Sequence, residues 1–413
     1  MIQTVEEKLN FEERVWNKKF FNIPAGDDFA CALIRGLEFR LQRQGRNNPD
    51  RFADCVIIMN SARSKRRLEE KFYEKRINIL PRIGLVTDLS FLVNGLVEPV
   101  KKSTLESKVE KLLNLESLIS SYLKEIGYRD YKKNSFELAS VLDKLFREMI
   151  LSGLNLDAFD KVDSMNLSNH WQQSLGFIKI VEQYKSNLEK QNTLDQESFN
   201  LSILELIEKE WKICPPKFPI IVAGSTGSRY PTSRLMNAVI NLPEGYVVLP
   251  GLDNLLSDSE WKQVKPDHPQ YSFKKLFNFI NNDNIDNTTI KLIKNWTADR
   301  RTKAVKSRAK FLSFMMLPAS HIGKWYDSNS ELKPILASAF EDVSIIESSS
   351  DRQESENIAL AIRINLQNQK SVSLVTDDKK LAKMVSIALK KWGIVPDNSF
   401  GEDPLQTLTS RFI

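Results

Sequence analysis

A loop of glycine and hydroxyl residues, Gly224 to Ser228 (GSTGS), is the part of the sequence best suited to binding a phosphate. It follows an apolar run at 220–223 and precedes a predicted helix that starts near Pro231. In a P-loop the second glycine is followed by Lys and Ser or Thr, which hold the β- and γ-phosphates and the magnesium ion. Here Gly227 is followed by Ser and Arg, so these ligands are missing. The plain alternative is a tight turn before a helix with a proline in its first turn.

A second glycine-containing turn, Pro24 to Asp28 (PAGDD), lies between a predicted strand and a predicted helix. A phosphate loop would need a lysine here, but the turn carries two aspartates. Their carboxylates would repel a triphosphate, so we expect no ATP at this turn. An ATPase that used the loop at 224–228 would need Asp253 or Asp377 to hold magnesium. This is the enzymatic alternative.

Basic residues gather in segments that suit a nucleic-acid backbone. From Lys291 to Lys310 the chain has eight Lys or Arg and one acid, with Trp296 among them, and we expect a basic helix. Cations on a helix attract phosphates without reading sequence, and an aromatic side chain can stack on bases. A solvated helix face is the alternative. The residues predicted to contact DNA are Arg63, Arg300, Arg301, Lys303, Lys306 and Arg308.

The cysteines and histidines are too scattered to predict a metal or catalytic centre. No two cysteines form a C-x-x-C pair, and no histidine lies at ligand spacing from them. No nucleophile or carboxylate accompanies the histidines in a known motif. We therefore expect no metal site, no catalytic residue and no cofactor in this chain. The residues considered are Cys31, Cys55, Cys214, His170, His268 and His321.

The composition excludes a membrane-spanning class. The chain has 413 residues, of which 41% are hydrophobic and 27% charged, with a net charge of +6. These proportions are typical of a globular protein. No run approaches the 18 or so apolar residues of a membrane span, and the first residues do not resemble a signal peptide. We expect a cytoplasmic protein without a membrane partner.

Apolar runs that alternate with amphipathic segments predict an α/β fold. We expect strands at 15–23, 54–59, 220–223, 246–249, 344–347 and 371–376, and helices at 29–42, 62–75, 351–368 and 379–392. This alternation predicts parallel strands with helices on both faces of a sheet. Asp377 and Asp378 follow the last strand, where they could contact a ligand or cap a helix.

Four segments follow from this pattern. Residues 1–100 form the first part of an α/β domain, and 101–213 form a helical insertion without convincing strands. Residues 214–340 complete the domain and carry the basic segment, with a polar linker at 281–289. Residues 341–413 begin a second α/β domain.

An ordered set of motifs resembles the AddB subunit of AddAB-type helicase-nucleases, in the form found in alphaproteobacteria. The similarity runs from about Val15 onward. Its motifs are NIPAGDDFACALIRGL, ADCVIIMNSARSKRRLEEKF, ILPRIGLVTDL, NHWQQSLGFIKIV, VAGSTGSRYPTSRLMNAVINLPEGYVVLPGLD, HPQYSFKKLF, IIESSSDRQESENIALAIR and SLVTDDKKLAKMVSIALKKWGIVPDNSFGEDPLQT.

The resemblance implies a superfamily 1 helicase-like fold that is inactive as an ATPase. It also implies a role in DNA double-strand break repair. The implied partners are an AddA-like helicase-nuclease subunit and DNA, which we expect to be single-stranded. The family's nuclease motif and iron–sulfur cysteines have no counterpart here, so we expect a fragment or a separately encoded half. The leading hypothesis is a DNA-handling scaffold for end resection. The alternatives are a DNA-stimulated ATPase or helicase in its own right, and a protein-interaction module only.

Overall fold

The computed structural model describes residues 18–46, 50–77, 79–93, 104–128, 131–154, 169–281, 287–327, 329–399 and 401. The chain divides into two compact units, Met1–Ala339 and Phe340–Ile413. Within the described residues, no helix is both long enough and apolar enough to cross a membrane.

A six-stranded parallel sheet forms the centre of the first unit, which confirms the predicted α/β class. The strand order is β3-β2-β6-β7-β1-β8, so strands distant in sequence lie side by side. The strand predicted at 15–23 covers only Phe20–Ile23 within the described residues. Lys294–Asn295 forms an additional edge strand that the sequence pattern does not predict. The strands are β1 (Phe20–Ile23), β2 (Val56–Met59), β3 (Arg82–Leu85), β6 (Ile220–Ala223), β7 (Gly245–Pro250) and β8 (Lys294–Asn295).

The central strands β2 and β6 are apolar on both faces because helices cover both. Along β2, Val56 and Ile58 enter one core, whereas Ile57 and Met59 enter the other. This division follows from the two-residue period of a strand, and continuous apolar runs are typical of buried parallel strands. The first core takes helices α9 (Gln196–Ile213), α10 (Tyr230–Ile240), α11 (Asp258–Lys262), α12 (Tyr271–Asn281) and α13 (Asn287–Leu292), while the second takes α2 (Phe29–Arg43) and α3 (Ala62–Glu74).

The helical insertion has a separate core made by three of its four long helices. Leucine, isoleucine and aromatic side chains from all three interlock there, including Leu115, Phe146 and Tyr184. The fourth helix, α9, instead packs against the sheet core through Ile203, Leu204 and Ile207. Two short strands, β4 (Thr104–Leu105) and β5 (Thr193–Leu194), pair in parallel, contrary to the expectation of no strand. The three helices are α5 (Lys108–Glu125), α6 (Tyr131–Ser152) and α8 (Asn169–Gln191).

The predicted basic helix from Lys291 to Lys310 is wrong as a single element. Helix α13 ends at Leu292, β8 pairs with β1, and a loop leads to α14 (Lys303–Met315), which Thr302 caps by accepting from the amide of Val305. Residues 282–286 of the polar linker predicted at 281–289 lie outside the described residues, whereas Asn281 ends α12 and 287–289 belong to α13. Beyond α14 the first unit ends in a short 3₁₀ turn (Ala319–His321), α15 (Lys324–Asp327) and α16 (Asn329–Ala339).

The second unit contains two helices, α17 (Asp351–Gln367) and α18 (Lys379–Lys390), close to their predicted bounds. The strands predicted at 344–347 and 371–376 are not formed, since neither segment pairs with any described residue. Ile345 and Val375 are 89% and 93% exposed. A strand exists only through its hydrogen-bonded neighbour, so apolar alternation alone was insufficient here.

Candidate nucleic-acid interface at the carboxyl edge of the sheet

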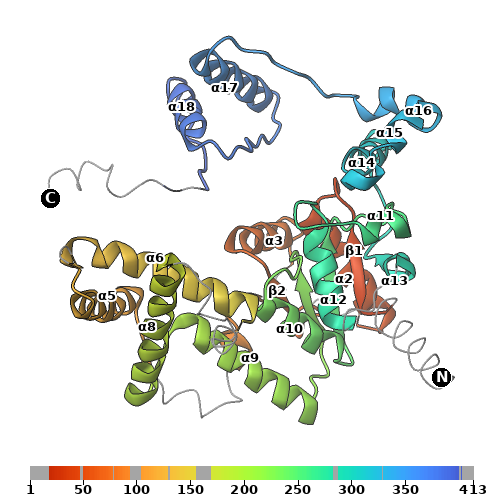
Figure 1. Ribbon diagram of the computed structural model, residues 1–413. Coiled ribbons are helices and arrows are strands. Elements are labelled where there is room, and N and C mark those ends of the chain that lie inside the picture. The colour runs from red at the N-terminus through yellow and green to blue at the C-terminus, as the bar shows by residue number, and fades with distance from the viewer. Residues whose placement is uncertain are drawn as a thin grey trace. The chain divides into compact units, whose positions relative to one another are not determined.

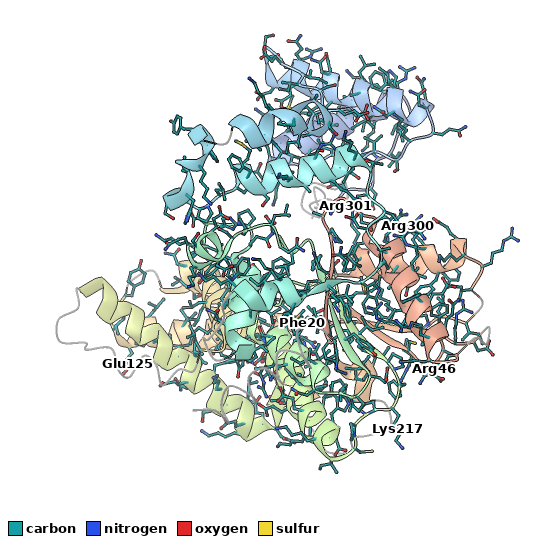
Figure 2. The ribbon with its side chains drawn as sticks, turned by 90° about the vertical axis from the view of Figure 1, so that its right-hand side faces the viewer. Phe20, Arg46, Glu125, Lys217, Arg300 and Arg301 are labelled. Atoms are coloured by element: carbon teal, nitrogen blue, oxygen red, sulfur yellow. The ribbon has the colours of Figure 1, made fainter. Side chains whose placement is uncertain are left out.

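The loops singled out in the sequence meet at one edge of the sheet, because all six strands run in the same direction. Figure 2 places Arg300 and Arg301 at this end of the first unit, and Arg46 and Lys217 at the other. Four glycines in the loops after β1, β6 and β7 have φ between +64° and +87°, a region that side chains other than glycine rarely adopt. They are Gly26, Gly224, Gly227 and Gly251.

A crevice typical of ligand sites in α/β proteins is expected between β2 and β6. Strand β2 leads into α3 on one face, whereas its neighbour β6 leads into α10 on the other. Ligands of open α/β sheets bind where adjacent strands diverge in this way. At this point a Cβ on Gly224 would lie only 3.4 Å from both the Asn60 Oδ1 and the Phe29 ring. The side chains of Asn60 and Phe29 therefore lie beside Gly224 at this point.

The backbone amide and carbonyl of Gly227, in the Gly224–Ser228 loop, are both hydrogen-bonded within the protein. The Gly227 amide donates to Ser225 Oγ at 3.2 Å, and the Gly227 carbonyl accepts from Ser233 Oγ at 2.7 Å. A Cβ on Gly227 would come within 2.7 Å of Leu276, so the loop lies directly on the side chains of α12. Phosphate loops instead turn their amides toward the ligand. These contacts fit the tight-turn interpretation of the loop.

The first residues of α10, the helix end at which a P-loop protein binds phosphate, contact the end of α6. Gly153 packs so closely on the Tyr230 ring that an added Cβ would lie 2.6 Å from it. Arg229 lies 3.7 Å from Glu148 of α6. Figure 1 shows α6 running from the insertion toward α10. The insertion thus contacts the sheet domain at the first residues of α10.

The two aspartates of the turn Pro24 to Asp28 interact with residues of the following helix, α2. Asp28 caps α2 by accepting from the Cys31 amide at 3.0 Å, and Asp27 lies 3.5 Å from Arg35. Partial burial alone would raise the pKa of Asp28, but the Cys31 hydrogen bonds and the charges of Arg67 and Lys71 outweigh it and lower this pKa. Asp28 is therefore a charged helix cap.

The guanidinium of Arg301 is hydrogen-bonded to other groups of the protein. It donates to both oxygens of Asp299 at 3.0 Å and to the carbonyl of Ala25 at 2.9 Å, and the Arg301 side chain is 14% exposed. The hydrogen bond from Arg301 is the main cause of the lowered pKa of Asp299. Through Ala25, Arg301 fastens the loop before α14 to the turn after β1.

The other predicted phosphate contacts differ in how accessible they are. Arg300 and Lys303 are exposed and make no ion pair with any described residue. Arg63 is exposed in the first turn of α3. Lys306 lies 3.8 Å from Asp299 and is 48% exposed, whereas half-buried Arg308 donates to the Ala339 carbonyl at 2.9 Å. Arg300 and Lys303 are thus the most accessible pair.

Trp296 cannot stack on a base, contrary to the sequence-based expectation. Only 2% of it is exposed, and its Nε1 donates to the Leu33 carbonyl at 2.9 Å. Its ring packs edge-on against Phe21, and the Arg40 guanidinium lies 3.5 Å from the ring centroid. Burial of this guanidinium lowers the pKa of Arg40 to about 10. Trp296 is a core residue, since tertiary contacts override its basic sequence neighbours.

Asp253 and Asp378 bind backbone amides. Asp253 Oδ1 accepts from the Leu255 amide at 2.9 Å, and Asp378 caps α18 by accepting from the amides of Lys380 and Leu381. For Asp378 this supports the helix-cap interpretation. Among the described residues, no group of three or more His, Cys, Asp or Glu is placed to hold a metal ion.

Two residues of this edge were missed by the sequence analysis. Buried Asn22 donates to the Leu252 carbonyl and accepts from its amide, both at 2.9 Å, which ties the loop after β7 to β1. Phe29, at the start of α2, lies beside Gly224. A polar residue inside an apolar strand, Phe-Phe-Asn-Ile, was the available signal for Asn22.

By sequence comparison, the chain matches no protein-family model and no curated protein. The functional interpretation therefore depends on the residues and geometry described above.

Proposed function

We propose that this chain is a DNA-handling scaffold without motor activity, equivalent to the helicase-like region of an AddB subunit. It would guide single-stranded DNA along the carboxyl edge of its sheet during double-strand break processing. One observation carries the proposal. Glycine loops that lack a phosphate-binding lysine and exposed cations lie at the same edge of the sheet. The sequence resemblance supplies the biological setting.

The exposed cations supply the affinity for DNA in this proposal. Arg300, Lys303 and Arg63 are solvent-exposed, so a phosphate could approach their side chains. Lys306 could exchange its contact with Asp299, at 3.8 Å, for a phosphate. Arg301 instead positions the loop, because its guanidinium is already bonded to Asp299 and Ala25. Binding of this kind is electrostatic and independent of base sequence.

The motor function is absent in this proposal because the loop after β6 lacks the lysine that would hold a nucleotide. The end of α6 also packs against Tyr230, the first residue of α10. ATP-driven movement would come from an AddA-like partner subunit, as the resemblance implies. Cytoplasmic localisation belongs to the same proposal.

Charge reversal of the accessible pair tests the DNA interface. We expect Arg300→Glu with Lys303→Glu to weaken binding of single-stranded oligonucleotides, measured by fluorescence anisotropy over a range of salt. Each lost phosphate contact lowers the salt slope by about 0.7, so the slope should fall by about 1.4. The double variant Lys209→Glu with Lys212→Glu, on α9, is the matched control and should keep the slope. Equal slopes in both double variants would remove the patch from the proposal.

An ATPase assay separates the scaffold from the enzymatic alternative. We expect the purified chain to show no DNA-stimulated ATP hydrolysis. Turnover that is lost on Thr226→Ala, with folding retained by circular dichroism, would instead support a nucleotide site at the Gly224–Ser228 loop. Titration with an AddA-type subunit in the absence of DNA tests the interaction-module alternative: binding there, with none to DNA, would favour it.

A further inference from the structure

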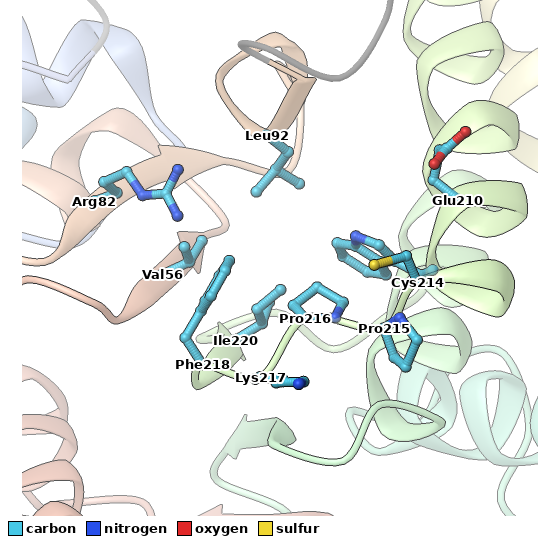
Figure 3. A pocket seen from close by; sticks show the side chains of 11 residues that line it. Val56, Arg82, Leu92, Glu210, Cys214, Pro215, Pro216, Lys217, Phe218 and Ile220 are labelled. Carbon is cyan, nitrogen blue, oxygen red and sulfur yellow. The ribbon is translucent and has the colours of Figure 1, made fainter.

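A cavity of about 390 Å³ opens at the amino edge of the sheet, opposite the proposed DNA interface. It lies between the first residues of β2, β3 and β6 and the end of α9 (Figure 3). Its volume falls within the range of about 300–1,000 Å³ that is usual for ligand sites.

The cavity is an open extension of the sheet core. Val56 and Ile220 belong to that core, and Leu92, Trp211 and Phe218 pack against it while partly exposed. An apolar group that entered would therefore contact apolar side chains and displace water from them. Pro215 and Pro216 restrict the backbone of one wall, so less conformational entropy is lost on binding.

The polar groups at the mouth leave one excess positive charge. Arg82, Lys217 and Glu210 are the ionisable lining groups apart from the Cys214 thiol. Arg82 stacks over the Phe218 ring at 5.3 Å, and neither Arg82 nor Lys217 has an acidic partner among the described residues. In Figure 3, Arg82 and Lys217 flank Phe218, while Glu210 lies across the cavity. The cationic side therefore adjoins an aromatic wall.

We propose that this cavity binds an aromatic or branched apolar group that carries a single carboxylate. The apolar part contacts Phe218, Trp211 and Leu92, and the carboxylate pairs with Arg82. Two sources share this chemistry: a small organic acid or chain terminus, and an internal polypeptide segment with an acidic residue beside an apolar one. The inference stands independently of the proposed DNA interface.

The rate at which Cys214 is alkylated can report ligand binding, because this exposed residue lines the cavity. Cys31 is less exposed and Cys55 is buried. We would follow alkylation of each cysteine in the full chain by mass spectrometry. At a concentration about ten times its Kd, a ligand should slow Cys214 labelling about tenfold and leave Cys31 unchanged. N-acetylphenylalanine and N-acetyl-aspartyl-phenylalaninamide are the probes for the two sources. Neutral N-acetylphenylalaninamide and the small acid N-acetylalanine are the controls.

The charge requirement is tested by Arg82→Gln, which should abolish the advantage of N-acetylphenylalanine over its amide. Lys209→Gln, on α9 outside the lining, is the matched control and should keep that advantage. Protection by the first probe only would indicate a small acid or chain terminus, and protection by the second would indicate an internal segment. The proposal is overturned if neither probe slows Cys214 labelling, or if both protect Cys31 equally.

Discussion

At the scale of single residues, two glycines with positive φ differ in the substitutions that they tolerate. Gly227 combines φ of +64° with a position where a Cβ would lie 2.7 Å from Leu276 and 2.9 Å from Met236. Gly45, after α2, has φ of +76° but no atom within 4 Å of such a Cβ. Gly227 is therefore required both for close packing and for its backbone conformation, whereas Gly45 is required for its backbone conformation only.

We predict that Gly227→Ala lowers the free energy of unfolding by about 2–4 kcal/mol, since it adds overpacking to left-handed backbone strain. Gly45→Ala should cost only the strain, about 1–2 kcal/mol. Urea denaturation of both variants measures the difference. Equal losses would show that the Gly227 loop moves away from Leu276 at little cost.

The lowered pKa of Glu260 predicts that the stability of the fold depends on pH. Burial of Glu260 alone would raise its pKa, but hydrogen bonds from Lys324 and Ser257 outweigh this and lower it below the usual 4.5. A carboxyl whose pKa is lower in the folded state stabilises the fold above its unfolded pKa, and this contribution is lost as the pH falls through the folded pKa. Glu260→Gln should cost about 1–2 kcal/mol at pH 7 and less below pH of about 4. Exposed Glu125→Gln is the control, and a constant loss for Glu260→Gln across this range would contradict the assignment.

At the scale of elements, a buried cation joins the helices of the insertion. Lys111 of α5 is only 7% exposed, and its Nζ lies 2.8 Å from Asp143 of α6, 3.9 Å from Glu197 and 4.0 Å from Asp195 at the start of α9. The Nζ also lies 4.9 Å from the Phe146 ring centroid. One cation therefore compensates carboxylates on two other elements.

We predict that Lys111→Met destabilises the insertion by about 3–5 kcal/mol, because it leaves buried carboxylates without their cation. Lys144→Met, which removes an exposed lysine of α6, should change stability by no more than about 0.5 kcal/mol. Thermal unfolding followed by circular dichroism compares the two. Similar melting curves would mean that Arg147, 2.8 Å from Glu197, suffices to hold the junction.

At the scale of the whole molecule, the two units differ in how much apolar surface they bury. The sheet of the first unit lies between two large cores. The described residues of the second unit form one small core from Ala359, Val385, Ala388 and Leu389. Apolar burial is the main source of stability, so the second unit should open more readily.

Native-state hydrogen exchange tests this difference. We predict that amides of α17 and α18 exchange faster, by a factor of about 100 or more, than those of β2 and β6, since local openings cost less than global unfolding. Amides of α3 serve as a helical reference in the first unit. Protection of α17 equal to that of β6 would contradict the prediction.

The sequence predicted those parts of the fold that depend on neighbours along the chain. The runs that form β2 and β6 are continuous apolar segments bounded by turns, and both were predicted within two residues. Ser61, Asp28 and Asp378 cap their helices, as local chemistry dictates. The prediction failed at 344–347 and 371–376, where a strand would require a partner that sequence periodicity does not specify.

The sequence by itself determined the α/β class, the absence of a phosphate-binding lysine after Gly227, and the concentration of cations between Lys291 and Lys310. Only the tertiary structure decided that Trp296 is buried, that Arg301 is hydrogen-bonded to the turn after β1, and that α6 contacts the start of α10. The physical reason is that residue type and spacing set local conformation and charge, whereas accessibility depends on contacts between segments far apart in sequence. Trp296 and Leu33, 263 positions apart, form one such contact.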